Sequence, residues 1–287
     1  MSLFRARFAP VVLAASIAAG ARASEPFPAP FAVEHHVVDG SLDGAPIAGE
    51  TVRDTYGGSF LVSERTNGIR TIVDFARREV TEVRPGEGTY WSLSFGRFAE
   101  LRKRLEEAES TDESPKLRGQ AAVERPVIRV EEIVADADVP ARSAPSERRE
   151  AGKRLRASVE GGRSLEVWVD ASAPRLTASG VAVLADFERS VLGAGDGEIG
   201  PADLLEAVRK REAGALAVRT RRAVGRGPAS GTDGPFLETV VTKATPVAAL
   251  PAGLVSVPEG LRRVPSPLEV VVSWAEDEAA LRRRGRK

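Results

Sequence analysis

Residues 59–95 read SFLVSERTNGIRTIVDFARREVTEVRPGEGTYWSLSF, and this stretch decides the fold class. Its apolar residues recur at every second position in short runs separated by turn residues, which is typical of an antiparallel β-meander. Asn67-Gly68 tolerates the positive φ angles of a two-residue type I′ turn. The pair therefore predicts a hairpin between Ser59–Thr66 and Ile69–Phe75.

The same alternation continues on both sides of this stretch. One side of the meander should be apolar and the other wet, because alternate side chains point to opposite faces. The sequence predicts strands at 31–38, 50–56, 59–66, 69–75, 79–83, 89–95, 127–133, 153–159, 163–170, 215–221, 236–243 and 267–274.

Helical spacing interrupts the strands twice. After Gly96, one stripe is formed by Phe98, Leu101, Leu105 and Ala108. Two further helices are expected near 177–213, the second of which opens with Pro201 at a first-turn position. Strands and helices together predict an α+β fold dominated by β structure.

Two segments, 110–122 and 134–151, are charged, contain proline and are poor in large apolar residues. They are interpreted as long mobile connections. They lie either within one sheet or at a domain boundary, and the simpler organisation is a single domain over 24–274. Residues 275–287 then form a basic C-terminal helix or tail.

The N-terminal 23 residues have the three parts of a secretory signal peptide, with Arg5 and Arg7 before an apolar run and Ala21-Arg22-Ala23 at its end. Cleavage is expected before Ser24. The apolar run is shorter than the roughly 20 residues that span a membrane, so no transmembrane span is expected in the mature protein. A chain with no cysteine fits a bacterial periplasm or a protein secreted from bacteria.

The charges are balanced at 41 basic and 41 acidic residues, which argues against nucleic acid as a partner. The basic residues of the tail are a local exception, and a run of this kind can make weak contact with anionic lipid. These residues are Arg282, Arg283, Arg284, Arg286 and Lys287.

No metal or cofactor is expected. His35 and His36 are adjacent in a predicted strand, so they point to opposite faces and cannot chelate one metal together. The loop Leu192–Asp203 resembles half of an EF-hand, but Leu192 and Ala194 stand where calcium needs oxygen ligands. The glycine cluster at 225–234 lacks the context of a phosphate loop.

Three segments resemble, in order, exported bacterial domains of unknown function that are similar to the periplasmic outer-membrane lipoprotein carrier. They are Ile69–Val83 with the following Thr89-Tyr90-Trp91, Leu165–Asp170, and Leu250–Leu261. The resemblance implies a curved antiparallel sheet, a half-barrel, whose concave face is covered by helices and can hold a lipid chain. The helices near 177–213 would be an insertion in that fold.

Two functions follow as alternatives. The first is a non-enzymatic binding or chaperone-like protein that holds an apolar ligand, a lipid or a lipoprotein acyl chain in the cell envelope. The second is an envelope hydrolase that uses a carboxylate pair, which the sequence does not identify. Two carboxyl groups facing each other in a polar cleft would favour the hydrolase. For the binding protein, the candidate ligand-binding residues are Val73, Phe75, Trp91, Leu93 and Phe95.

Overall fold

The structure is a computed structural model that describes residues 25–40, 46–109, 127–133, 152–160, 163–192, 199–223 and 236–285. The expected signal peptide, the connections at 110–122 and 134–151 and the glycine cluster at 225–234 lie outside the described residues.

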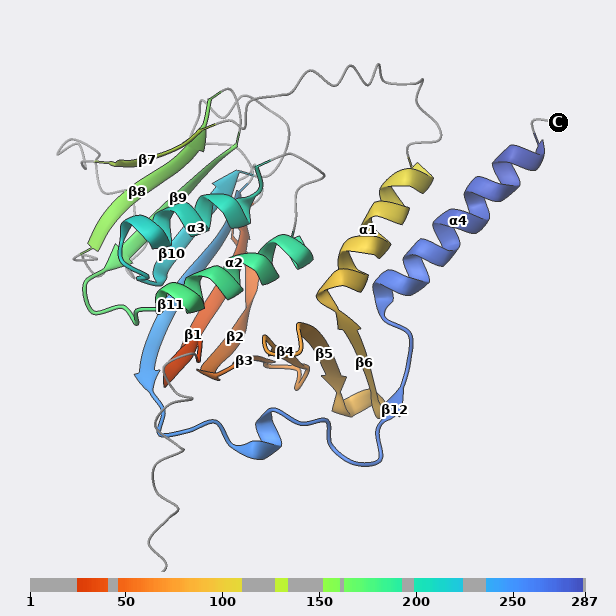
Figure 1. Ribbon diagram of the computed structural model, residues 1–287, viewed down its shortest axis with the longest axis horizontal. Coiled ribbons are helices and arrows are strands. Elements are labelled where there is room, and N and C mark those ends of the chain that lie inside the picture. The colour runs from red at the N-terminus through yellow and green to blue at the C-terminus, as the bar shows by residue number, and fades with distance from the viewer. Residues whose placement is uncertain are drawn as a thin grey trace, which may run out of the picture.

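The described strands form one twelve-stranded sheet (Figure 1). Its order is β12-β6-β5-β4-β3-β2-β1-β11-β10-β9-β8-β7, and neighbouring strands are antiparallel except β12, which is parallel to β6. The strands are β1 (Phe27–Gly40), β2 (Pro46–Gly58), β3 (Phe60–Arg65), β4 (Arg70–Asp74), β5 (Glu79–Arg84), β6 (Thr89–Ser94), β7 (Ile128–Glu132), β8 (Gly152–Val159), β9 (Ser164–Asp170), β10 (Ala217–Ala223), β11 (Phe236–Pro246) and β12 (Arg262–Arg263).

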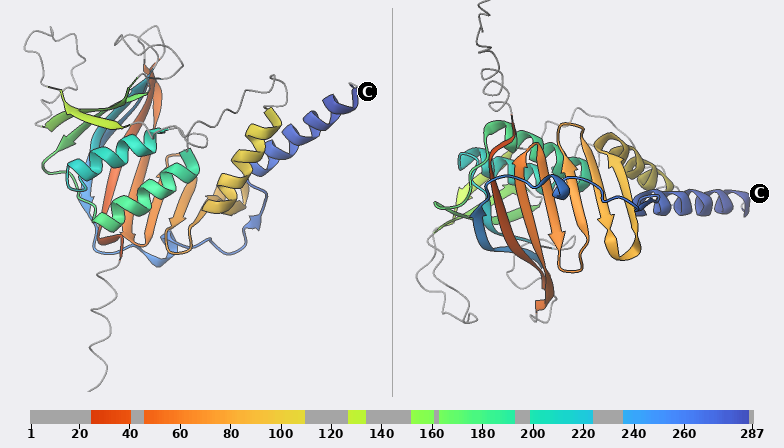
Figure 2. Two further views of the ribbon diagram at one scale, coloured as in Figure 1. Left: turned by 45° about the horizontal axis from the view of Figure 1, so that its top comes forward. Right: turned by 90° about the horizontal axis from the view of Figure 1, so that it is seen from below.

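Four α-helices are described, namely α1 (Phe95–Glu109), α2 (Ala178–Leu192), α3 (Pro201–Arg211) and α4 (Pro267–Gly285). The sheet curves, and α2 and α3 lie across its concave face (Figure 2). Helix α1 runs beside α4 near the β6 end of the sheet. This arrangement confirms the expected fold class, a β-dominated α+β protein built on an open, mostly antiparallel sheet.

The apolar core of the concave face has two parts. A central cluster lies beneath α1 and α2, and a second cluster lies between α3 and strands β8 and β9. The strand residues of the central cluster are Phe27, Phe31, Val33, Tyr56, Leu61, Val73, Val80, Trp91 and Leu93, and Phe75 follows directly after β4. The second cluster contains Leu155, Ala157, Leu165, Val167, Val169, Leu204, Val208 and Ala215.

The opposite, convex face of β3–β5 is also apolar, so the expected wet side is wrong here. Val62, Ile72 and Val83 are buried on this face. They are covered by residues 247–261, an irregular segment that we call the strap. It leads from β11 to β12 across the strands (Figure 2, right). The packing residues of the strap include Leu250, Leu254, Val255, Val257 and Leu261.

Polar contacts fix the strap at its centre. The guanidinium of Arg70 donates hydrogen bonds of 2.9 Å to the carbonyl oxygens of Gly253 and Ser256. Because irregular backbone has no ladder partner, these two bonds satisfy carbonyls that packing alone would leave without one.

The hairpin predicted at Asn67-Gly68 is present, but its turn is not type I′. Gly68 has a φ of +80°, whereas Asn67 is not among the described residues with positive φ. The Gly68 N–H donates to the Arg65 carbonyl at 2.9 Å, and the Arg65 N–H donates to the Ile69 carbonyl at 3.0 Å. This is the pattern of a type I turn followed by a glycine in the left-handed region.

The strand predicted at 267–274 is wrong, because these residues begin α4. The run of valines favours a strand by propensity, but a capping box precedes it. The Ser266 N–H donates to the Glu269 carboxylate at 2.8 Å, and the Ser266 hydroxyl accepts from the Glu269 N–H at 3.2 Å. Pro267 takes the first helical position, where its missing N–H costs nothing.

Candidate functional site

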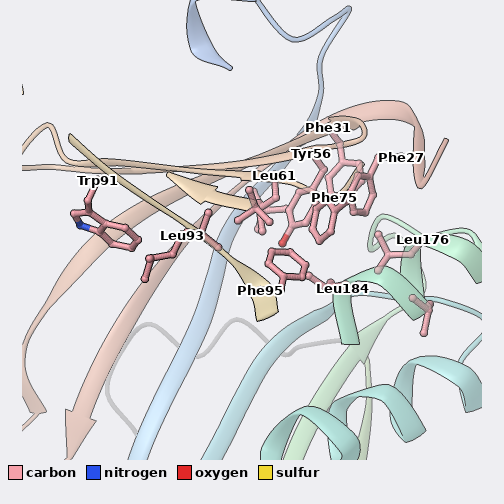
Figure 3. Packing of buried hydrophobic residues seen from close by; sticks show 14 of the residues in the cluster. Phe27, Phe31, Tyr56, Leu61, Phe75, Trp91, Leu93, Phe95, Leu176 and Leu184 are labelled. Carbon is pink, nitrogen blue, oxygen red and sulfur yellow. The ribbon is translucent and has the colours of Figure 1, made fainter. Parts of the chain in front are cut away.

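The structure brings the five sequence-predicted residues together on the concave face. Each of them is at most 8% exposed, and all five belong to the central apolar cluster (Figure 3). Strand alternation predicted them correctly as a shared apolar surface. These residues are Val73, Phe75, Trp91, Leu93 and Phe95.

Strand register arranges the concave side chains in rows that cross the sheet. One row is entirely apolar apart from a phenol oxygen, and we call it the apolar row. Tyr56 stacks on Phe31 at its β1 end, with ring centroids 4.7 Å apart. The row consists of Phe31, Tyr56, Leu61, Val73, Val80 and Leu93 on β1 to β6.

Aromatic rings extend the apolar row on one side. Phe27 makes edge contacts with Tyr56 and Phe75 at centroid distances of 5.3 and 5.4 Å. Phe75 in turn contacts Phe95 at 6.4 Å. Because edge-to-face pairs add to the burial of apolar area, these ring contacts strengthen the packing of the concave face.

Two helices, rather than a second sheet, cover this surface. Phe187 of α2 lies 6.0 Å from Phe75 and 5.5 Å from Phe95, measured between ring centroids. Phe98 of α1 lies 6.0 Å from Trp91. In this structure, helix side chains therefore occupy the apolar surface that a ligand would contact.

Polar contacts hold the edge of this cover. Arg78, in the β4–β5 turn, forms a 2.6 Å ion pair with Asp186 of α2, and both side chains are exposed. Arg102 of α1 donates to the carbonyl of Val191 at the end of α2. Exposed ion pairs contribute little to stability because water competes for both partners, so the Arg78–Asp186 pair orients α2 more than it locks it.

A second row, which we call the polar row, lies two residues further along each strand. It begins at β2 and ends at Trp91 on β6, so it runs directly beside the apolar row. Its members are Asp54, Ser63, Thr71, Glu82 and Trp91. The concave face thus changes from apolar to polar over one step of about 7 Å along the strands.

Asp54 is the acid of the polar row whose pKa is shifted. Its carboxylate accepts a hydrogen bond from Ser63 and lies 3.6 Å from Nδ1 of His35. Burial raises the pKa of Asp54, and the nearby His35 and the Ser63 hydrogen bond only partly oppose this effect. A buried carboxylate with a raised pKa is a candidate for function.

The arrangement of serine, aspartate and histidine differs from a hydrolase triad. In a triad the histidine lies between serine and aspartate and accepts the serine proton. Here Asp54 lies between Ser63 and His35, so the hydroxyl donates to the carboxylate. As the sequence predicted, His36 points to the other face, where its Nδ1 lies 3.0 Å from the hydroxyl of Thr51.

Glu82 is the second acid of the polar row. It accepts hydrogen bonds from Nε1 of Trp91 at 3.1 Å and from Nε of Arg84 at 2.8 Å. Three strand spacings, about 14 Å, separate the β2 and β5 backbones. Carboxyl pairs in glycoside hydrolases lie about 5–9.5 Å apart. Asp54 and Glu82 therefore lack the close spacing that the hydrolase alternative needs.

Among the described residues, no group of three or more histidine, aspartate or glutamate side chains could hold a metal ion. Asp203, from the EF-hand-like segment, instead accepts a 2.8 Å hydrogen bond from the Gly200 N–H at the start of α3. It also pairs with Arg189 at 2.7 Å. Residues 193–198 of that segment lie outside the described residues. None of the described helices is long and apolar enough to cross a membrane.

Comparison with known proteins gives distant structural similarity alone. No protein-family model and no curated protein match the sequence. A solved structure of PNGF-II has a TM-score of 0.34 and 10% identity, and covers 86% of this chain and 33% of its own. The chain thus spans one third of the PNGF-II chain.

A second solved structure is named "putative outer membrane lipoprotein-sorting protein domain from Vibrio parahaemolyticus". It has a TM-score of 0.29 and 8% identity, and covers 81% of this chain and 92% of its own. The resemblance found in the sequence is supported as a distant structural similarity to this domain.

Proposed function

We propose that the protein is a non-enzymatic binding protein of the bacterial cell envelope, which holds an apolar ligand such as a lipid or lipoprotein acyl chain on the concave face of its sheet. One observation carries this proposal. The apolar row and the aromatic rings beside it are covered by two helices, whose own rings occupy this surface as a ligand chain would.

The exchange of helix for ligand is physically reasonable. Burial of each methylene contributes about 0.8 kcal/mol, so a twelve-carbon chain gains roughly 9 kcal/mol before the cost of opening. Opening exposes Phe187 and Leu184 of α2, which are replaced on the sheet by the chain. The Arg78–Asp186 pair is solvated in both states, so its loss adds little to that cost.

The direct test is titration of delipidated mature protein with a fluorescent fatty acid. Saturable binding is expected, and Leu93→Glu should weaken it because the new carboxylate lies within the apolar row. Leu281→Glu is the matched control, since Leu281 is 65% exposed on α4. Far-UV circular dichroism checks that both variants remain folded. Absence of saturable binding by the folded wild-type protein contradicts the proposal.

A cross-link tests whether α2 must move. The chain has no cysteine, so Arg78→Cys with Asp186→Cys provides a single reactive pair for a short bis-maleimide. Cross-linking should block ligand uptake. The same chemistry at Arg97→Cys with Glu100→Cys, an exposed pair within α1 that ties no two elements together, should leave uptake intact. Unchanged uptake in the first variant would show that α2 does not control entry.

Native mass spectrometry of protein purified from its own cell envelope identifies the ligand class. A mass increment that disappears on delipidation would name the lipid and would also support the proposed location in the periplasm or outside the cell.

A further inference from the structure

Asp54 is unusual among the largely buried acids. Its side chain is 16% exposed, and its side-chain partners in the described part of the chain are His35 and Ser63. Histidine is a cation only when protonated, so Asp54 has no permanent positive partner there. The comparable acids each pair with arginine: Glu82 with Arg84, Glu166 with Arg154 and Arg156, Glu188 with Arg209, and Glu238 with Arg219.

Burial of the Asp54 carboxylate without a cation is unfavourable for the folded protein. A buried carboxylate loses its hydration, and without a fixed cation that loss is not recovered. The charged groups that α2 and α3 bring near Tyr56 do not correct it, because Arg209 and Glu188 neutralise each other in a pair of 2.8 Å. The site therefore favours an added positive charge.

Asp54, where a positive charge is favoured, lies next to the apolar row. Tyr56 lies two residues further along β2 on the same face, about 7 Å away. A chain that lies over Tyr56, Leu61 and Val73 can place its polar end on the polar row, where the hydroxyls of Ser63 and Thr71 follow Asp54 on adjacent strands.

We infer that the ligand is an amphiphile with a primary ammonium group, whose hydrocarbon lies on the apolar row while the ammonium pairs with the Asp54 carboxylate and donates to the Ser63 and Thr71 hydroxyls. This inference rests on the proposed function, because it adds a head group to the same chain. A simple alkylamine and an ethanolamine lipid share this chemistry.

The test compares ligands of one chain length that differ in the head. Dodecylamine, dodecanol and dodecanoate compete with an uncharged fluorescent alkyl probe at pH 8, where an alkylamine is still protonated. Wild-type protein should bind the amine at least about tenfold more tightly than the alcohol, a difference of about 1.4 kcal/mol. Asp54→Asn should remove this preference and leave the affinity for dodecanol unchanged.

Glu82→Gln is the matched control, because Glu82 belongs to the same row but is neutralised by Arg84. It should retain the preference for the amine. Lysophosphatidylethanolamine against lysophosphatidylcholine distinguishes the two sources: tighter binding of the ethanolamine lipid, lost in Asp54→Asn, assigns the lipid, and preference confined to dodecylamine assigns the alkylamine.

Two results would overturn the inference. Equal binding of amine and alcohol by wild-type protein, or a preference that survives in Asp54→Asn, would reject the ammonium site while leaving chain binding in place. Failure of all three ligands to bind would reject the proposed function as well.

Discussion

Arg209 of α3 donates two hydrogen bonds of 2.8 Å to the carboxylate of Glu188 on α2. Both side chains are buried, at 9% and 12% exposure, so the pair joins the two helices within the protein and not at its surface. The Arg78–Asp186 pair, in contrast, lies at the edge of the cover and is exposed to solvent. Helices α2 and α3 are therefore expected to stay together if α2 moves.

Removal of one partner of the Arg209–Glu188 pair should lower the stability of the fold. We expect Arg209→Ala to lower the free energy of unfolding by about 3–5 kcal/mol, because it leaves the Glu188 carboxylate buried and unpaired. Urea unfolding measures the change. Arg97→Ala is the control, since Arg97 makes a 2.7 Å pair with Glu100 that is exposed, and it should cause a much smaller loss. Equal losses of unfolding free energy in the two variants would show that burial does not determine how much an ion pair contributes to stability.

The pH dependence of stability should report the burial of Asp54. Its folded pKa is raised above the ordinary value of 3.8, chiefly by burial. The folded protein therefore binds more protons than the unfolded chain in the window that begins near 3.8 and extends upward, and the free energy of unfolding falls as pH rises through it. Asp54→Asn should stabilise the ligand-free protein above this window and lose its advantage below it.

Glu166 should show the opposite sign. Burial raises its pKa, but hydrogen bonds from Arg156 and Arg154 outweigh burial and lower the pKa overall. This group stabilises the fold above its unfolded pKa, and the contribution is lost as pH falls through the folded pKa. Glu166→Gln should destabilise the protein at neutral pH and have less effect in acid. Urea midpoints between pH 3 and pH 8 compare the two variants, and parallel curves would contradict both assignments.

Gly57 on β2 should be sensitive because the strap crosses it. A Cβ at this position would lie 1.9 Å from Cδ1 of Leu250, so Gly57→Ala must displace the leucine. We expect a loss of about 1–3 kcal/mol in the free energy of unfolding, measured in urea. Leu250→Ala should relieve the clash, so the double variant should lose less than the sum of the single losses. Gly86→Ala is the control, because its Cβ meets no atom within 4 Å.

Two local patterns in the sequence, the alternation of apolar residues in strands and their helical spacing, predicted most strands and helices. The meander, the hairpins and the helices α1 to α3 all have clear signals, and the five candidate ligand residues follow from strand alternation. The pairing of β1 with β11 joins residues about two hundred positions apart. No local pattern encodes that pairing, so the sheet order could not be derived.

The features that the sequence did not predict have physical causes. The leucines of the strap lie in an irregular segment, so they follow no regular spacing that would show which face of the sheet they cover. The valines of α4 favour a strand, and the local signals for a helix are the Ser266–Glu269 capping box and Pro267 at the first helical position. The meeting of His35, Asp54 and Ser63 depends on the register of three strands. Sequence spacing does not fix that register.

The end of α4 provides a test of the expected contact with anionic lipid. Val271, Trp274 and Leu281 are exposed on this helix, whereas Val272 and Ala279 on another face are buried. Residues 282–287 contain five basic and no acidic residues, and each basic residue near an anionic membrane contributes about 1 kcal/mol. The apolar side chains and the adjacent positive charge together fit an anionic bilayer surface.

Trp274 is the probe, because it is 68% exposed while Trp91 is buried and Trp168 is half-buried. We expect vesicles that contain phosphatidylglycerol to shift its emission to shorter wavelength, as the indole leaves water, and we expect added salt to reverse the shift because it screens the charges. Pure phosphatidylcholine vesicles should have little effect, and Trp274→Phe should remove the response. An equal shift with neutral vesicles would show that the basic residues take no part, and no shift with either would reject the contact.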